Sequence, residues 1–176
     1  KQENFLLLDI GGEITDISMV KKNTLRESTS FPLGRNFFTR GVALDLGCTL
    51  SEAVSFISLF KDGHSEESIV EKLTLILNKL RIEWLKKFQD SLASLSNDIS
   101  IPSTIYIVLD KDLVDFFSET IKNEQFRQYI LTESKFEIIF LKSELFRGIA
   151  VFKENVFCEP FLIIDSIYIN RFLISI

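Results

Sequence analysis

The amino-acid sequence predicts an α/β domain built on a mixed five-stranded β-sheet. Short apolar runs bounded by turn residues predict five strands, and longer segments with apolar residues three and four positions apart predict helices. Their order along the chain is three strands, a group of helices, then strand, helix, strand and helix. Successive strands joined by short turns favour antiparallel pairing, whereas strands separated by helices favour parallel pairing. The sheet should therefore contain three antiparallel strands continued by two parallel ones.

The first three strands should form an antiparallel meander. Residues 5–10 are a short apolar run that ends at a pair of glycines, and residues 14–20 form the next strand-like run. The polar residues 21–24 are turn-like, and residues 25–32 are predicted as the third strand.

Two short helices follow the meander. Asn36 is predicted to cap a helix that runs to about residue 46, and Gly47 suits its C-terminus. The second helix covers residues 49–60, with Thr49 or Ser51 as its cap.

Residues 65–95 predict one long helix capped by Ser65, with two glutamates in its first turn. Its apolar residues form a single stripe about 27 residues, or roughly 40 Å, long. The stripe consists of Ile69, Leu73, Ile76, Leu80, Trp84, Phe88, Leu92 and Leu95. A helix packed on a sheet and a coiled-coil seam both give this pattern.

The C-terminal half alternates strands and helices. Residues 104–109 form a continuous apolar strand suited to a sheet centre, followed by a helix over 113–129 and a strand over 136–141. Residues 147–157 are predicted as a loop or short strand, and Pro160 begins the last helix. This apolar C-terminal segment suits a docked core helix or, as the alternative, a helix on a membrane surface.

Composition excludes several classes. The 176 residues carry a net charge of −5 and no basic tract, which argues against nucleic-acid binding. Cys48 and Cys158 lie too far apart for a metal motif or a disulfide framework, so we expect the reducing cytoplasm. No run of about 18 uncharged apolar residues predicts a membrane span. Because a buried-type strand begins directly after Lys1, we expect a piece of a longer protein with no visible signal peptide.

The glycine turn after the first strand is suited to binding an anion. Backbone N–H groups in a glycine turn can bind an anion, because no Cβ blocks the approach. A carboxylate at the end of the preceding strand, here Asp9, can hold hydrated magnesium beside that anion. The alternative is that Gly11-Gly12 is only a hairpin turn.

The stretch "LLLDIGGEITDISMV" resembles the second phosphate loop of the actin-like ATPase superfamily, whose form is D-x-G-G-x-x-T-D between two strands. The next block, "TSFPLGRNFFTRGVALDLGCTLSEAVSFISLFKDG", resembles FtsA- and PilM-type proteins, and "FCEPFLIIDSIYIN" is similar to their closing helix. The resemblance implies a ribonuclease-H-like fold with helices on both faces. It spans most of the chain, strongly over residues 4–63 and loosely thereafter. It implies that residues 1–176 are a single domain II, the second lobe of a two-lobed fold, without the first lobe.

The resemblance also implies a site for ATP and magnesium. Asp9 would hold Mg²⁺ through water, Thr15 would brace the turn, and Gly34 would mark a second glycine loop. The implied phosphate-binding residues are Asp9, Gly11, Gly12, Glu13, Thr15 and Gly34. The catalytic base is unassigned, since it would come from elsewhere in the protein, and the isolated domain is expected to be inactive as an ATPase.

The sequence departs from the family in four places. Arg35 replaces the second glycine of the P-x-G-G loop, where its guanidinium either contacts a phosphate or stays solvated, and Gly41 replaces an aspartate. Val54 and Ile57 replace the Glu and Lys that contact ribose and adenine. Residues 110–112, Asp-Lys-Asp, replace the glycines of the adenosine loop. We therefore expect the phosphate half of the site to be kept and the adenosine half to be degenerate.

These patterns favour a scaffold or weak nucleotide binder of cell division or pilus assembly. Its partners would be its own N-terminal lobe and proteins of the division or pilus machine, with self-association as a further alternative. It would act in the cytoplasm, or at the inner face of the membrane through its partners. The alternatives are a functional ATP-binding ATPase half, a relative of sugar or acetate kinases, and an unrelated α/β domain with a chance hairpin.

Overall fold

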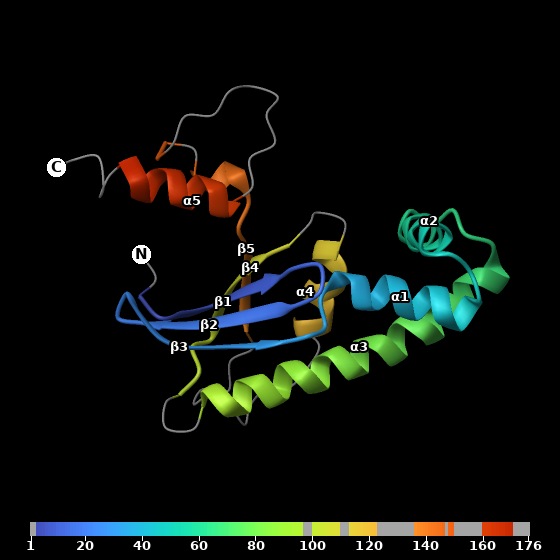
Figure 1. The fold of residues 1–176 in the computed structure, drawn as a ribbon, viewed down its shortest axis with the longest axis horizontal. Helices are drawn as coiled ribbons and strands as arrows, with labels where there is room; N and C mark the ends of the chain where they lie inside the picture. Colours follow the sequence, from blue (N-terminus) through green and yellow to red (C-terminus); the bar gives the residue numbers. More distant parts are fainter. Residues whose placement is uncertain are drawn as a thin grey trace.

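The computed structural model describes residues 3–96, 100–109, 113–122, 136–146, 148–149 and 160–170. Its centre is a five-stranded sheet with the order β3-β2-β1-β4-β5 (Figure 1). The strands are β1 Phe5–Ile10, β2 Thr15–Lys21, β3 Thr24–Phe31, β4 Thr104–Val108 and β5 Glu137–Phe140. The pairs β1–β2 and β2–β3 are antiparallel, and β1–β4 and β4–β5 are parallel. This arrangement confirms the predicted mixed sheet.

Helices lie on both sides of the strands. They are α1 Arg35–Leu46, α2 Leu50–Lys61, α3 Glu67–Leu95, α4 Val114–Lys122 and α5 Pro160–Tyr168, with a short 3-10 helix, η2, at Ser143–Phe146. In Figure 1 α3 and α5 lie on opposite sides of the strands, and α1 and α2 lie together at one end of the molecule.

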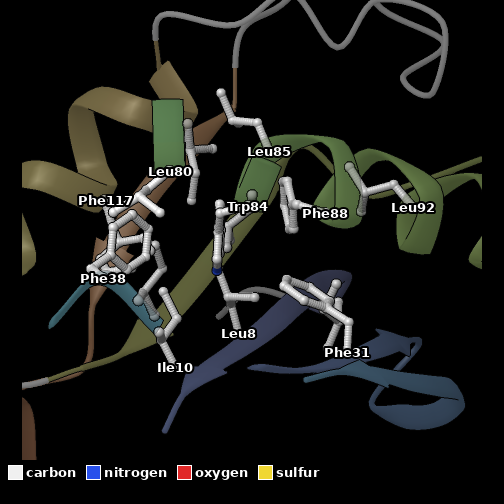
Figure 2. Packing of buried hydrophobic residues seen from close by; sticks show 14 of the residues in the cluster. Leu8, Ile10, Phe31, Phe38, Leu80, Trp84, Leu85, Phe88, Leu92 and Phe117 are labelled. Atoms are coloured by element: carbon white, nitrogen blue, oxygen red, sulfur yellow. The ribbon is translucent and has the colours of Figure 1, made fainter. Parts of the chain in front are cut away.

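The long helix α3 packs on the sheet, so the coiled-coil alternative is wrong. Every residue of its predicted stripe is buried in the core except Ile69, which is half-buried. Trp84 lies at the centre of this core, stacked on Phe88 with ring centroids 5.3 Å apart (Figure 2). The rings of Phe31 and Phe117 meet Trp84 edge-on from β3 and α4. The α3 stripe therefore joins the sheet to α4.

The cap predicted at Asn36 is wrong. Gly34 is the N-cap of α1, and no side chain bonds to the first turn as a cap. The amide group of Asn36 instead donates to Glu13 of the β1–β2 turn, a contact that local sequence does not reveal. Gly47 ends α1 in the left-handed conformation, with φ of 66°, as predicted.

The other two caps divide between a correct and a wrong prediction. Thr49 caps α2 in a capping box with Glu52, in which each residue satisfies a backbone N–H of the other. The predicted cap at Ser65 is wrong, because Glu66 is the N-cap of α3 and makes no side-chain bond there. The Ser65 hydroxyl is shielded from solvent and has no partner among the described residues.

The remaining boundaries agree with the predictions to within a few residues where the structure describes them. Pro160 begins α5 as predicted, and β4 and β5 are each slightly shorter than predicted. Residues 123–129 of the predicted fourth helix, most of 147–157, and Cys158 lie outside the described residues. Among the described helices none alone is long and apolar enough to cross a membrane; only α1 and α2 together, bent by 102°, have that length and composition.

Candidate functional site

The turn between β1 and β2 is closed by its own backbone. The N–H of Gly11 donates to the carbonyl of Ile14 at 3.0 Å. Neither Gly11 nor Gly12 has a positive φ; the left-handed residues of the meander are Lys22 and Asn23, with φ of 52° and 58°, in the β2–β3 turn. The glycine pair is therefore not required by a left-handed backbone conformation.

The first turn of α1 docks directly on this glycine turn. Three consecutive N–H groups of the helix start donate to three consecutive carbonyls of the turn. The bonds run from Gly34 to Glu13 (3.0 Å), from Arg35 to Gly11 (2.9 Å) and from Asn36 to Gly12 (2.9 Å). Helix N-termini leave such donors without helical partners, and here the turn satisfies them. An anion bound at this site would therefore use the amides of the turn itself.

Gly34 allows this close docking. A Cβ at position 34 would lie 2.5 Å from the carbonyl oxygens of both Gly11 and Gly12. Both obstructing atoms belong to the backbone and cannot rotate away. The structure thus brings the two predicted glycine loops into contact, which the sequence did not predict.

Two amides of the turn remain available for a ligand. Within the part of the chain that the structure describes, the N–H groups of Gly12 and Glu13 have no acceptor. Adjacent N–H groups of a turn are the usual donors of a phosphate-binding nest. The turn therefore offers donors at the predicted position.

Asp9 has a second carboxylate directly opposite it. The β1–β2 register pairs Asp9 with Asp16, which places their side chains on the same face of the sheet at neighbouring positions. Two facing carboxylates supply the oxygen ligands that Mg²⁺ prefers, and like charges in this arrangement repel unless a cation or other partner is present. No group of three or more metal-binding side chains occurs among the described residues, so Mg²⁺ here would keep much of its water shell. Asp16 was not among the site residues predicted from the sequence. Counting residues across the hairpin from Asp9 would have placed Asp16 opposite it.

Thr15 braces the turn from inside the protein. Its buried hydroxyl donates to the carbonyl of Leu33 at 2.8 Å, just before Gly34. The indole N–H of Trp84 reaches the same carbonyl at 3.1 Å and the Thr15 hydroxyl at 3.4 Å. Thr15 thus connects the start of β2 to the residue before Gly34, and Trp84, which the sequence indicated only as a core residue, joins this contact.

The side chain of Glu13 ties the turn to the outer face of α1. Arg40 pairs with both of its carboxylate oxygens, at 2.9 and 2.8 Å, and Asn36 donates to one of them at 2.9 Å. The hydrogen bond from Arg40, followed by that from Asn36, lowers the pKa of Glu13 from 4.5 to about 2, and the same contact raises the pKa of Arg40. The sequence did not predict the contact of Arg40 with Glu13. The only signal is that Arg40 and Asn36 lie four residues apart on one face of a helix.

This contact predicts a pH dependence. Because the pKa of Glu13 is lower in the folded protein than in the unfolded chain, its carboxylate stabilises the fold fully above pH 4.5. That stabilisation should be lost as the pH falls from 4.5 toward 2. Urea unfolding of the unmodified protein and of Glu13→Gln should therefore give midpoints that converge over this range.

Both partners are about half exposed, with side-chain exposures of 48% for Arg40 and 60% for Glu13, so salt should weaken the effect. Arg40→Gln supplies the control, since Glu13→Gln should cost much less when Arg40 is already absent. A midpoint difference that stays constant between pH 7 and pH 2.5 would contradict the assignment.

The positions at which the sequence departs from the family that it resembles lie mainly on α1 and α2. Val54 is 56% exposed on α2, and Ile57 is half-buried against the core. A Cβ at Gly41 would lie 2.6 Å from the Leu80 methyl groups, so α1 and α3 approach each other closely at this position. Arg35 is exposed at the first residue of α1 beside the turn, and residues 110–112 lie outside the described residues.

No protein-family model and no curated protein matches this sequence. Solved structures share its fold, among them a chain of the PilM–PilN type IV pilus biogenesis complex, with 17% identity and a TM-score of 0.54 over 67% of this chain and 33% of that chain. The ethanolamine utilization protein EutJ from Carboxydothermus hydrogenoformans has 14% identity and a TM-score of 0.51 over 79% of this chain and 44% of that chain. ParM from Bacillus thuringiensis, solved with ATP, has 13% identity and a TM-score of 0.51 over 99% of this chain and 48% of that chain.

These similarities establish the fold. With the strand order, they show that the chain has the actin-like ATPase fold that its opening motif predicts. The chain spans less than half the length of each of these neighbours.

Proposed function

We propose that this chain is the phosphate-binding lobe of a bacterial actin-like protein of the FtsA or PilM type, which binds nucleotide weakly and acts mainly as a scaffold. The observation that carries the proposal is the β1–β2 turn. Its Gly12 and Glu13 amides have no acceptor among the described residues, and Asp9 and Asp16 face each other on the strands that lead into it. Amide donors beside paired carboxylates suit a phosphate group with its magnesium ion.

The apolar nucleoside positions support weak binding. Binding free energy falls by about 1–3 kcal/mol for each polar group of the ribose or adenine that is buried without a hydrogen-bond partner. Val54 and Ile57 cannot form such bonds, so two losses would weaken ATP binding by roughly two orders of magnitude. Weak nucleotide binding favours a scaffold over a nucleotide-driven enzyme.

The proposed partners are proteins. One structural neighbour belongs to a pilus biogenesis complex, which supports a place in a pilus or division machine. We propose that the first lobe of the same fold lies elsewhere in the full protein and completes the site, with self-association as a further possibility. The net charge of −5 argues against nucleic acid, and the proposed location is the cytoplasm, including the inner face of the membrane through partners.

A functional ATPase is the second candidate. It is favoured by the ParM neighbour, which was solved with ATP. In that case the proposed first lobe would supply the catalytic base, and this domain alone would not hydrolyse ATP.

Substitution of Asp9 by asparagine tests the phosphate site. The variant keeps the shape of the side chain but removes a charge that attracts Mg²⁺, so magnesium-dependent ATP binding should weaken at least tenfold, or by about 1.4 kcal/mol. Isothermal titration calorimetry of the full protein with ATP, with and without Mg²⁺, measures the change.

Asp90→Asn, an exposed substitution on α3, is the matched control and should leave binding unchanged. The thermal midpoint of Asp9→Asn without ligand should stay near that of the unmodified protein. Equal magnesium-dependent affinity in the unmodified protein and Asp9→Asn would remove Asp9 from the site.

A further inference from the structure

Trp84, in the middle of α3, contacts the residue that follows the proposed phosphate-binding turn and the residue that leads into α1. Its indole nitrogen points from the helix toward the strands (Figure 2). The N–H donates at 3.1 Å to Leu33, which precedes the start of α1, and lies 3.4 Å from the hydroxyl of Thr15, which follows the turn. The side chain of Trp84 is fully buried, so these contacts are shielded from water.

Two other contacts connect the turn, α1 and α3 to one another. The turn is bonded to the start of α1 by the backbone N–H groups of residues 34–36. Helix α1 lies against α3 where Gly41 meets Leu80, one helical turn before Trp84. Trp84 joins α3 back to the turn, so each of the three elements is fixed to the other two.

We propose that Trp84 is a positioning residue that holds the Gly12 and Glu13 amides in place before a ligand arrives. The inference rests on the proposed function, because it treats these amides as the phosphate donors. Donors fixed in advance need no reorganisation when the anion binds, which favours affinity. A phenylalanine would fill most of the same space, but only the indole N–H bonds to Leu33 and reaches the Thr15 hydroxyl beside the turn.

The indole N–H can be removed without leaving the Leu33 carbonyl unpaired. This carbonyl accepts two hydrogen bonds, one from Thr15 and one from Trp84, and a carbonyl oxygen has two lone pairs for them. In Trp84→Phe the bond from Thr15 remains, so no buried acceptor is left empty. The variant therefore loosens the turn while most of the core packing stays.

The test measures amide hydrogen exchange by NMR in the full chain, without ligand. Trp84→Phe should speed exchange of the Arg35 and Asn36 amides, which donate to the turn, by roughly 3- to 10-fold, as expected for one lost hydrogen bond. Phe88→Leu is the control, because Phe88 stacks on Trp84 and is equally buried but has no N–H. It should lower global stability and leave these two exchange rates unchanged relative to the other amides of α1.

A second readout is the affinity for magnesium tripolyphosphate. Trp84→Phe should weaken it by roughly 3- to 10-fold and Phe88→Leu by less than about twofold. Thr15→Val breaks the same connection from the other side and should reproduce the exchange effect, whereas Thr15→Ser should retain the unmodified rates.

The outcomes separate the two claims. Faster exchange only in Trp84→Phe and Thr15→Val supports the positioning role, whether or not tripolyphosphate binds. Failure of tripolyphosphate to bind would contradict the proposed function. Exchange that is equally fast in Phe88→Leu, or unchanged in Trp84→Phe, would overturn the positioning role whatever the affinity.

Discussion

Replacement of Trp84 by alanine should lower the free energy of unfolding by about 3–5 kcal/mol, the usual cost of truncating a large buried aromatic residue. Trp84 is fully buried, stacks on Phe88 and meets the rings of Phe31 and Phe117. Alanine would leave a cavity at the junction of α3, α4 and the sheet. Because domains of this size are stable by only about 5–15 kcal/mol, a large part of the total stability would be lost.

Urea unfolding followed by circular dichroism measures this loss. Tryptophan fluorescence cannot be used, because the substitution removes the only tryptophan of the chain. Ile82→Ala is the matched control, because Ile82 lies two residues away on α3 and is 64% exposed. It should change stability by about 0.5 kcal/mol or less. A cost for Trp84→Ala below about 1.5 kcal/mol would show that the aromatic cluster does not hold the fold together.

Substitution of Gly34 by alanine should cost about 2–3 kcal/mol and displace the turn from α1. The added Cβ would lie 2.5 Å from the carbonyl oxygens of Gly11 and Gly12, so either the turn or the helix start must move. That movement strains the hydrogen bonds from residues 34–36 to the turn. The amide exchange of Arg35 and Asn36 should therefore accelerate together with the loss of global stability.

Gly12→Ala is the control for this prediction. A Cβ at Gly12 would approach only the side-chain amide of Asn36, at 3.3 Å, and that side chain can shift. Its cost should stay below about 1 kcal/mol. Equal destabilisation by the two substitutions would mean that the docking of the turn on α1 does not depend on Gly34.

The fold was predictable because its signals are local. The α3 stripe recurs every three or four residues, and seven of its eight members are buried in the core. The strands follow from short apolar runs, and the capping box of Thr49 and Glu52 lies within four residues. Each of these features depends on residues that are close in sequence, which is where periodicity and capping rules apply.

The missed features depend on residues that are far apart in sequence. Arg40 meets Glu13 across 27 positions, and Trp84 meets Thr15 across 69. The wrong cap at Asn36 has the same cause, because its side chain binds Glu13 instead of its own helix. A single sequence offers no sign of these pairs until the sheet register and helix docking are known.

The candidate site was predictable only in part. The sequence identified the turn, and the structure places Gly34 against Gly11 and Gly12. The sequence contains Asp16 as the last acid of the quoted motif, but only the β1–β2 register shows that it faces Asp9. The sequence shows glycine at position 41, but only the structure shows that α1 lies close to Leu80 of α3 there.

The central claim is that this domain keeps a phosphate site and lacks a working nucleoside site. Titration calorimetry of the full protein with magnesium tripolyphosphate and with magnesium ATP tests it most directly. The account predicts measurable binding of both, with affinities within about threefold of each other, because Val54 and Ile57 add no polar contact to the adenosine. ATP binding at least tenfold tighter than tripolyphosphate, or no binding of either at millimolar concentration, would contradict it.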